Sequence, residues 1–361
     1  IAMLVPFLGN YFYACAVSSV IRSAYSSGYK VIVFENGEDY EQEVKICQFL
    51  QKSGIDGLVV APARTTNDLD HFVKLQHEGI PMVFFDRIAP NLDTDRVLED
   101  DYKGACTVVR HMIDGGCRKI AHIALPRRYL WAQKREKGYL QALKDRHLFT
   151  DEKLIVECED VSEVYRITRQ LVLHSGVDGI FAANDAFAVH VLSVLRQMKC
   201  RVPEEVAVCG YGNEPSTEVT FPALTTVNKD GYRVGNIAAG LLIRRIEDKE
   251  EVPTVTRLLK PELIVRDSTL SVDSRPMMML FLSNDSSLET SSWKPSASFV
   301  NLNGSRSISP SEEIAAAKWL SLAISMPTKI FMRLYLPFLK SDTMMSTIDY
   351  HRRLDRNKYS E

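Results

Sequence analysis

Short β-branched runs alternate with amphipathic stretches from residue 1 to about residue 213. This alternation is typical of strand–helix repeats and predicts an α/β fold built on parallel sheets. Helices are indicated where apolar residues recur at a spacing of four, as in Phe12, Ala16, Val20 and Ala24 or in Val109 and Ile113. We expect strands at residues 2–7, 30–34, 56–61, 81–85, 119–124, 154–158, 177–182 and 206–210.

Five glycines mark the expected ends of helices. Each lies just before an expected strand, at Gly28, Gly54, Gly79, Gly116 and Gly176. A helix often ends in a left-handed residue, and glycine adopts that conformation without the steric penalty of a Cβ atom. The repeated glycine therefore supports the predicted alternation of helices and strands.

Polar side chains gather where the expected strands end. They are Asn10, Asp86, Arg87, Asn184, Asp185, Asn213 and Glu214. In open α/β sheets, ligands bind beyond the carboxyl ends of the strands. We therefore expect one ligand-binding cleft to which both halves of the chain contribute.

Length and composition narrow the class of protein. A chain of 361 residues exceeds a single ordinary core, so at least two lobes are expected. Hydrophobic residues make up 45% and charged residues 25%, and there is no apolar run of about 20 residues that would span a membrane. The opening residues do not resemble a signal peptide, which favours the cytoplasm. The net charge of -2 argues against an intrinsic attraction to nucleic acid.

Signatures of catalysis and of cofactor or metal binding are absent from the sequence. The seven cysteines are scattered among apolar residues and are expected to be reduced, and no phosphate loop, nucleophile elbow or zinc-protease motif occurs. Gly210-Tyr211-Gly212 runs into Pro215 and predicts a turn after a strand, not a nucleotide site. His111 and His122 fall on apolar elements and are expected to be structural. We predict a protein without cofactor, without metal and without catalytic activity.

Two features leave alternatives open. The aromatic group Tyr11, Phe12 and Tyr13 fits either core packing or a stacking wall at the rim of a cleft. Arg135 lies in a charged run on a helix, and such a run is usually a solvated face.

The composition and the periodicity of the sequence change after Thr269. Residues 270–361 are rich in serine and lack periodicity. This tail is predicted to be a disordered appendage, a small independent module or the product of a shifted reading frame.

Ten segments occur in the order and spacing of the LacI/GalR family of transcriptional regulators. They are IAMLVPFLGNYFY, SGIDGLVVAPA, EGIPMVFFDR, DDYKGA, GCRKIAHIALP, REKGYLQAL, DGIFAANDAFAVHVLSVLR, VPEEVAVCGYGNEP, PALTTV and PELIVRDST. Residues 1 to about 269 resemble the whole regulatory domain of that family, whose fold is similar to periplasmic sugar-binding proteins. The resemblance implies that a DNA-reading helix-turn-helix headpiece would precede Ile1 and is absent from this chain.

The family resemblance implies a periplasmic-binding-protein-like fold of type I. Two Rossmann-like lobes with parallel sheets would be joined by three crossovers. The N-lobe would comprise residues 1–115 and 228–250, and the C-lobe residues 117–226 and 254–269. The resemblance also implies a homodimer that holds two headpieces on operator DNA and switches by rotation of the lobes.

The resemblance places the effector contacts at positions that match the family motifs. They are Phe12, Tyr13, Asp86, Asp100, Arg135 and Asn184. Where many sugar-binding members carry an aspartate, this chain has Gly212, followed by Asn213 and Glu214, and we include these three in the expected site. The departure argues against an ordinary hexose or disaccharide. Arg135 is expected to be the strongest polar anchor.

Three functions compete on the sequence alone. The first is the ligand-sensing and dimerisation domain of a DNA-binding regulator, a repressor, with a sugar, a sugar derivative or a purine as effector. The second is a periplasmic sugar-binding protein of an ABC transporter, which would share the fold. The third, an α/β enzyme, is disfavoured by the missing catalytic motifs. The segments VPEEVAVCGYG, PALTTV and ELIVRDST favour the regulator.

Overall fold

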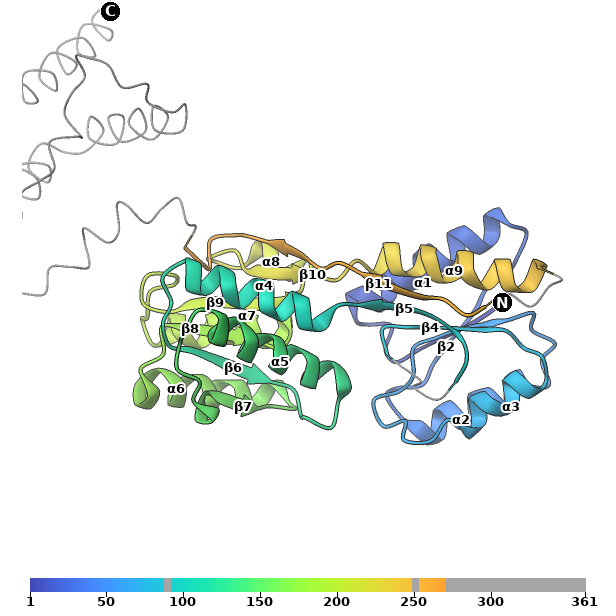
Figure 1. The fold of residues 1–361 in the computed structure, drawn as a ribbon, viewed down its shortest axis with the longest axis horizontal. Helices are drawn as coiled ribbons and strands as arrows, with labels where there is room; N and C mark the ends of the chain where they lie inside the picture. Colours follow the sequence, from blue (N-terminus) through green and yellow to red (C-terminus); the bar gives the residue numbers. More distant parts are fainter. Residues whose placement is uncertain (88–91, 249–252, 271–361) are drawn as a thin grey trace, which may run out of the picture. The chain divides into compact units, whose positions relative to one another are not determined.

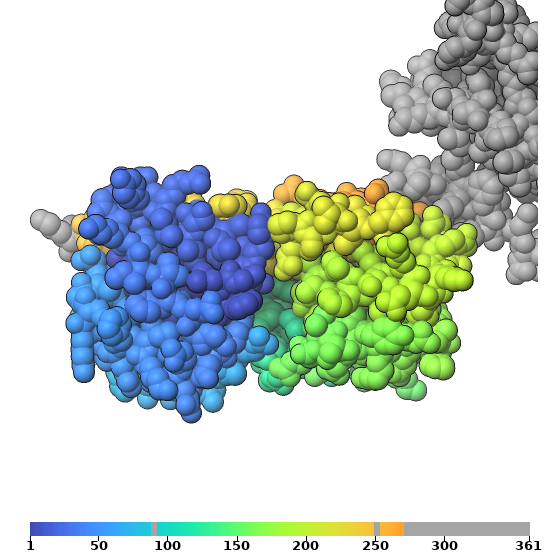
Figure 2. All heavy atoms as spheres, turned by 180° about the vertical axis from the view of Figure 1, so that it is seen from behind, coloured from blue at the N-terminus to red at the C-terminus, as the bar shows by residue number. Residues whose placement is uncertain are grey.

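The computed structural model describes residues 1–87, 92–248 and 253–270. The tail predicted for residues 270–361 lies, apart from Leu270, outside the described residues. The described residues form two lobes, each built on a six-stranded sheet with helices on both faces (Figure 1). Figure 2 shows the lobes from behind, the first in blue and the second in green to yellow. The predicted α/β class with two parallel-dominated sheets is confirmed.

The N-lobe contains the first sheet, in which all strands are parallel and follow the order β11-β5-β4-β3-β1-β2. Its strands are β1 (Ala2–Val5), β2 (Ile32–Glu35), β3 (Leu58–Val60), β4 (Met82–Phe85), β5 (Asp95–Glu99) and β11 (Thr256–Leu259). Its helices are α1 (Tyr11–Ser26), α2 (Tyr40–Leu50), α3 (Asp70–His77) and α9 (Gly231–Glu247).

Side chains of the N-lobe strands point alternately into two apolar layers. In β1, Met3 and Val5 pack with residues of α1 and α9, whereas Ala2 and Leu4 pack with residues of α2 and α3. Because helices cover both faces, the central strands are apolar at every position. This explains why they appear in the sequence as short continuous hydrophobic runs.

The C-lobe repeats this plan with the order β12-β10-β9-β8-β6-β7. Its strands are β6 (Ile120–Ala124), β7 (Ile155–Glu157), β8 (Gly179–Ala182), β9 (Ala207–Gly212), β10 (Thr225–Asn228) and β12 (Glu262–Ile264). Its helices are α4 (Asp101–Asp114), α5 (Leu130–Asp145), α6 (Val164–Ser175), α7 (Asp185–Gln197) and α8 (Ser216–Val219), with short 3-10 turns η1 (Glu152–Leu154) and η2 (Val161–Glu163). Strand β12 is antiparallel to β10, while the other neighbours are parallel.

The chain passes between the lobes three times, as predicted. The crossings lie between β5 and α4, between β10 and α9, and between β11 and β12. The lobe boundaries differ from those expected. Helix α4 packs on α5 in the core of the C-lobe and does not belong to the N-lobe, because its apolar face, which includes Val108 and Met112, contacts that core. Strand β10 lies in the C-lobe sheet through Asn228, and β11 pairs with β5 in the N-lobe sheet.

All eight predicted strands are present, and none of their ends is shifted by more than two residues. The sequence missed β5, β10, β11 and β12. The five glycines expected at helix ends all have a positive φ, between 59° and 111°. Six of the seven cysteines are buried, and His122 is buried with its ring stacked on Phe181. Among the helices of the described ranges, none has the length and hydropathy that crossing a bilayer would require.

Candidate functional site

The two lobes share one topology, and this places their ligand-binding edges. In each sheet the second strand is added on one side of the first strand, and the third strand on the other side. This change of side falls between β1 and β3 in the N-lobe and between β6 and β8 in the C-lobe. Loops that follow such strands diverge to opposite faces of the sheet and leave a crevice at the carboxyl ends. A site at this position can draw on both lobes.

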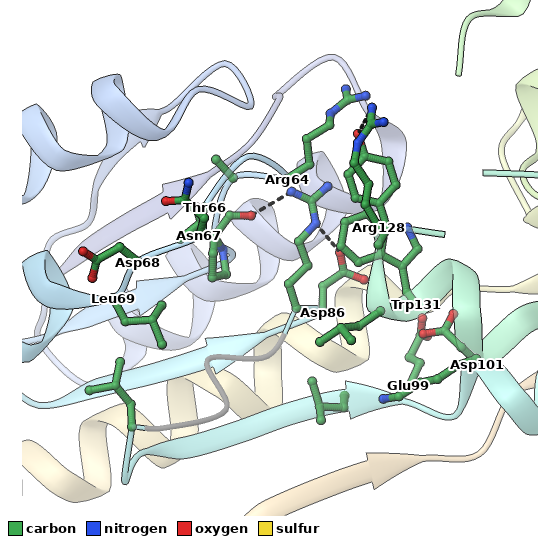
Figure 3. A pocket seen from close by; sticks show the side chains of 18 of the residues that line it. Arg64, Thr66, Asn67, Asp68, Leu69, Asp86, Glu99, Asp101, Arg128 and Trp131 are labelled. Atoms are coloured by element: carbon green, nitrogen blue, oxygen red, sulfur yellow. Dashed lines mark hydrogen bonds and ion pairs between the residues drawn. The ribbon is translucent and has the colours of Figure 1, made fainter. Parts of the chain in front are cut away.

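A cavity of about 380 Å³, here called the cleft cavity, is lined from both lobes. It is lined by Phe7, Asn10, Phe12, Tyr13, Gly37, Glu38, Arg64, Asp86, Arg87, Leu125, Trp131, Arg135, Asn184, Tyr211, Gly212, Glu214 and Lys229. A second cavity of about 630 Å³, the flanking cavity, shares Arg64, Asp86, Arg87 and Trp131 with it. In Figure 3, Asp68 and Leu69 lie on one side of the flanking cavity, and Trp131 and Asp101 on the other. Both volumes suit a small organic ligand.

Helix α1 positions the aromatic part of the cleft cavity. Asn10 caps the helix by accepting a hydrogen bond from the backbone N–H of Phe12 at 3.0 Å. The first turn then carries Phe12 and Tyr13, whose rings contact Phe85. Both rings are buried in the core and also line the cavity, so the two interpretations of this aromatic group are compatible. Tyr11 is exposed and lies outside the lining.

Asp86 is the buried carboxylate of the N-lobe wall. Tyr13 donates its hydroxyl hydrogen to Oδ2 at 2.6 Å, and Lys229 donates from Nζ to Oδ1 at 2.5 Å. Burial alone would raise the pKa of Asp86, but the positive charges of Lys229 and Arg87 lower it to about 2. Lys229 also lies over the ring of Phe12, at 4.1 Å from its centroid. Asp86 is therefore ionised and fully engaged.

Arg87 joins the N-lobe wall to the C-lobe. Its guanidinium donates to the two carboxylate oxygens of Glu38 at 2.6 and 2.8 Å and to the carbonyl oxygen of Pro62 at 2.7 Å. The same guanidinium lies 4.6 Å from the ring centroid of Trp131, on α5 of the C-lobe. This contact brings the lobes together at the border of the two cavities, since both residues line both of them.

Arg135 is buried, with 5% of its surface exposed, so it does not lie on a solvated helix face. Its Nε donates to Oδ1 of Asp101 at 2.9 Å, and Nη1 donates to the carbonyl oxygen of Ala183 at 2.5 Å. The guanidinium lies 3.8 Å from the ring centroid of Tyr211. The C-lobe therefore holds Arg135 in a fixed position at the wall of the cleft cavity.

The turn after β9 is fixed by the buried carboxylate of Asp185. That carboxylate accepts from the hydroxyl of Thr226 at 2.6 Å and from the backbone N–H of Glu214 at 2.8 Å. Asn184 caps α7 by accepting from the backbone N–H of Phe187 at 2.8 Å. Gly212 has a φ of 144°, which favours glycine. The turn thus presents Gly212 and Glu214 to the cavity.

Glu99 closes the network at the crossovers. Its Oε1 accepts from the backbone N–H of Asp230 at 3.1 Å, and its Oε2 lies 3.8 Å from Nζ of Lys229. Burial raises the pKa of Glu99 to about 7, against the opposing effect of Lys229. The Glu99 carboxyl group lies at the end of β5, where the first crossover begins. It therefore contacts two residues of the second crossover, Lys229 and Asp230.

The structure brings seven of the nine predicted site residues to the cleft cavity: Phe12, Tyr13, Asp86, Arg135, Asn184, Gly212 and Glu214. It places the other two elsewhere. Asp100 caps α4 by accepting from the backbone N–H of Lys103, and its neighbour Asp101 is the residue that contacts Arg135. Asn213 bonds to Asn228 and Arg266. That the seven contact an effector stays a prediction.

The sequence missed three of the lining residues that organise the cleft: Glu38, Trp131 and Lys229. Lys229 directly follows β10 at a crossover, and Trp131 lies in the first turn of the helix after β6. Both positions follow strand ends, which was the available signal. Within the described ranges, no three histidine, cysteine or acidic residues are grouped so as to hold a metal ion.

Comparisons with known proteins agree with this architecture. A family model described as a periplasmic binding protein-like domain matches residues 109–269. The ribose operon repressor of Halalkalibacterium halodurans is 29% identical over 271 residues, which are 74% of this chain and 79% of that protein.

Solved structures of regulators are similar as well. A complex of the transcriptional regulator CelR with cellobiose is 28% identical, has a TM-score of 0.67, and the match covers 74% of this chain and 83% of that one. A regulatory protein of the LacI family from Chloroflexus aggregans is 26% identical, has a TM-score of 0.66, and the match covers 74% and 97%. The chain therefore contains a periplasmic binding protein-like domain and is a homologue of the LacI-family transcriptional regulators.

Proposed function

We propose that the described part of this chain is the ligand-sensing domain of a LacI-family transcriptional regulator. The effector is a sugar, a sugar derivative or a purine bound in the cleft cavity. The observation that carries the proposal is the lining of that cavity, which comes from both lobes at their two strand-order reversals. The similarity to repressors favours a regulator over the binding protein of a transporter.

The chemistry of the lining suits a ring-shaped polar ligand. Phe12, Trp131 and Tyr211 offer aromatic surface, and Arg135 and Asn184 offer polar groups nearby. Aromatic rings pack on the apolar face of a sugar or on a purine, while polar groups set its orientation. The complex of the similar regulator CelR with cellobiose supports a sugar-like ligand, while Gly212 in place of the aspartate still argues against an ordinary hexose or disaccharide in this chain.

The route from effector to DNA is part of the same proposal. A ligand that contacts both lobes stabilises the orientation in which it binds best, and three crossing segments are compatible with rotation about them. A homodimer would carry this rotation to headpieces on operator DNA. Exposed apolar side chains on α1 and α9, which include Ile21, Tyr25 and Tyr232, support an association surface.

A binding role fits the cleft better than catalysis. Basic side chains that line the cleft cavity form ion pairs with acidic side chains: Arg87 with Glu38, Lys229 with Asp86 and Arg135 with Asp101. Arginine stays protonated in proteins, so the guanidinium groups of Arg87 and Arg135 fix the geometry of the wall and do not act as general bases. The similarity to regulators points the same way.

The proposal is tested by titrating the full chain with cellobiose, ribose, glucose, glucosamine, inosine and hypoxanthine in a calorimeter. A member of this panel should bind and raise the melting temperature, because a ligand of the folded state stabilises it. Trp131→Ala should weaken that binding about tenfold, since it removes the stacking partner of Arg87.

The matched control is Tyr165→Ala, an exposed aromatic residue on α6 outside both cavities. Its binding should equal that of the unmodified chain. Absence of binding by the whole panel, or chemical turnover of any member, would contradict the proposed function.

A further inference from the structure

The charges around the cleft cavity are almost completely paired. Glu38 is held by Arg87 and lies 3.7 Å from Arg64. Asp86 is held by Lys229 and by the hydroxyl of Tyr13. The two carboxylates of the N-lobe wall, Glu38 and Asp86, therefore already accept hydrogen bonds from other side chains of the protein.

Glu214 is the exception among the acidic residues that line the cleft cavity. Its backbone is held firmly, because its N–H donates to Asp185 and its carbonyl oxygen accepts from the hydroxyl of Thr217 at 2.6 Å. Its side chain is half-buried and, within the described residues, its carboxylate makes no hydrogen bond or ion pair. A fixed backbone with a free carboxylate at a cavity wall is arranged to meet a ligand.

The neighbours of Glu214 favour the same conclusion. Burial and the nearby negative charge of Asp185 raise the pKa of the Glu214 carboxyl. Hydrogen-bond donors on a ligand would lower the free-energy cost of keeping the Glu214 carboxylate ionised at this half-buried position, whereas a second anion would raise that cost. A Cβ at position 212 would lie 3.0 Å from Oδ2 of Asp185, so glycine at this position lets the Asp185 carboxylate approach the turn that carries Glu214.

We propose that Glu214 determines the effector class. The effector presents hydroxyl or amino hydrogens to this carboxylate, and a phosphorylated or carboxylated ligand is rejected at this end of the cleft. The inference rests on the proposed function and deepens it. A ligand without a hydrogen-bond donor at this point would displace water from the Glu214 carboxylate and offer nothing in return, which lowers its affinity strongly. One residue can therefore account for much of the selectivity between ligands.

The experiment compares neutral and phosphorylated partners on the full chain. Calorimetry uses ribose against ribose 5-phosphate, glucose and glucosamine against glucose 6-phosphate, and inosine against inosine 5′-phosphate. The variants are Glu214→Gln and Glu214→Ala, with Glu218→Gln as the control because Glu218 is exposed and lies outside the cavity lining. Melting temperatures report whether each variant folds.

We expect a neutral or amino compound to bind and its phosphorylated partner to bind at least tenfold more weakly. Both Glu214 variants should lose at least tenfold in affinity for the bound compound, with melting temperatures near that of the unmodified chain, while Glu218→Gln retains full affinity. Tighter binding of the phosphorylated partner, or unchanged affinity in both Glu214 variants, would overturn the inference and leave the proposed function intact. Failure of every compound to bind the unmodified chain would overturn the proposed function together with the inference.

Discussion

The N-lobe and the C-lobe share a strand order, yet their cleft edges are built differently. On the N-lobe side, Asp86 and Glu38 are each bound to a cation. On the C-lobe side, Arg135 is held within its own lobe, while Glu214 has no partner among the described residues. Under the proposed function, topology determines where a ligand binds, and the state of pairing at each edge determines which ligand binds. The N-lobe forms a closed platform and the C-lobe supplies the free group.

The largest effect is expected where the C-lobe holds Arg135. Arg135→Ala would leave Asp101 buried without its cation, and breaking a buried ion pair typically costs about 3–5 kcal/mol of unfolding free energy. Urea unfolding of the full chain measures this loss. Lys137→Ala, an exposed residue on the same helix, should change it by less than about 0.5 kcal/mol. Equal, small losses in both variants would show that Arg135 does not hold the C-lobe wall.

A second test concerns the crossovers that separate the two lobes. The unfolded chain releases the proton of Glu99 near pH 4.5, whereas the folded chain keeps it to about pH 7. Protonated Glu99 therefore makes its full contribution to the free energy of unfolding below pH 4.5. This contribution is lost as the pH rises to about 7. Glu99→Gln lacks this loss, so it should gain about 3 kcal/mol relative to the unmodified chain between pH 4 and pH 8.

Unfolding free energies at several pH values measure the gain. Asp86 titrates near pH 2, below this window, and so does not obscure it. Glu41→Gln, an exposed residue on α2, serves as the control. A constant offset between Glu99→Gln and the unmodified chain would show that Glu99 is not the group that titrates here.

The smallest effect concerns the helix pair of the N-lobe, where α9 lies directly against α1. A Cβ added at Gly235 would lie 2.4 Å from the carbonyl oxygen of Ala16, so Gly235→Ala must push the helices apart and should cost about 1–3 kcal/mol. Gly240, on the same helix, has no neighbouring atom within 4 Å of such a Cβ. Gly240→Ala should therefore stabilise the chain by about 0.5–1 kcal/mol. Thermal or urea unfolding distinguishes the two, and the same sign for both would contradict the close approach of the helices.

The strands that the sequence predicted and those it missed differ mainly in their content of polar residues. The predicted β1, β3, β4 and β8 have apolar neighbours on both faces and appear as continuous hydrophobic runs. The missed β11 is largely exposed, and β5 carries Asp95, Arg96 and Glu99 among its five residues. Such short, charged strands owe their conformation to a neighbouring strand, and no local pattern encodes that pairing.

The candidate site divides in the same way. Residues directly after strands, such as Asp86 and Asn184, were predicted because position alone places them at the edge. The cation that pairs with Asp86 comes from Lys229, separated by 143 residues in the sequence, and its approach depends on how the crossovers fold. Asp100 was expected at the site, but the helix uses it as a cap, and Asp101 contacts Arg135 instead. A one-residue difference of this kind depends on where a helix starts, which sequence patterns locate poorly.

The three crossovers also set the order in which the lobes can be completed during synthesis. The N-lobe sheet includes β11, so it lacks its last strand until residue 259 has left the ribosome. Five of the six C-lobe strands lie between Ile120 and Asn228 and emerge earlier as one continuous piece. The first lobe to begin is thus completed only after most of the second has emerged. Until β11 has been synthesised, β5 is an edge strand of the nascent N-lobe and is unpaired on one side. Such an edge can pair with strands of other chains in a crowded cell.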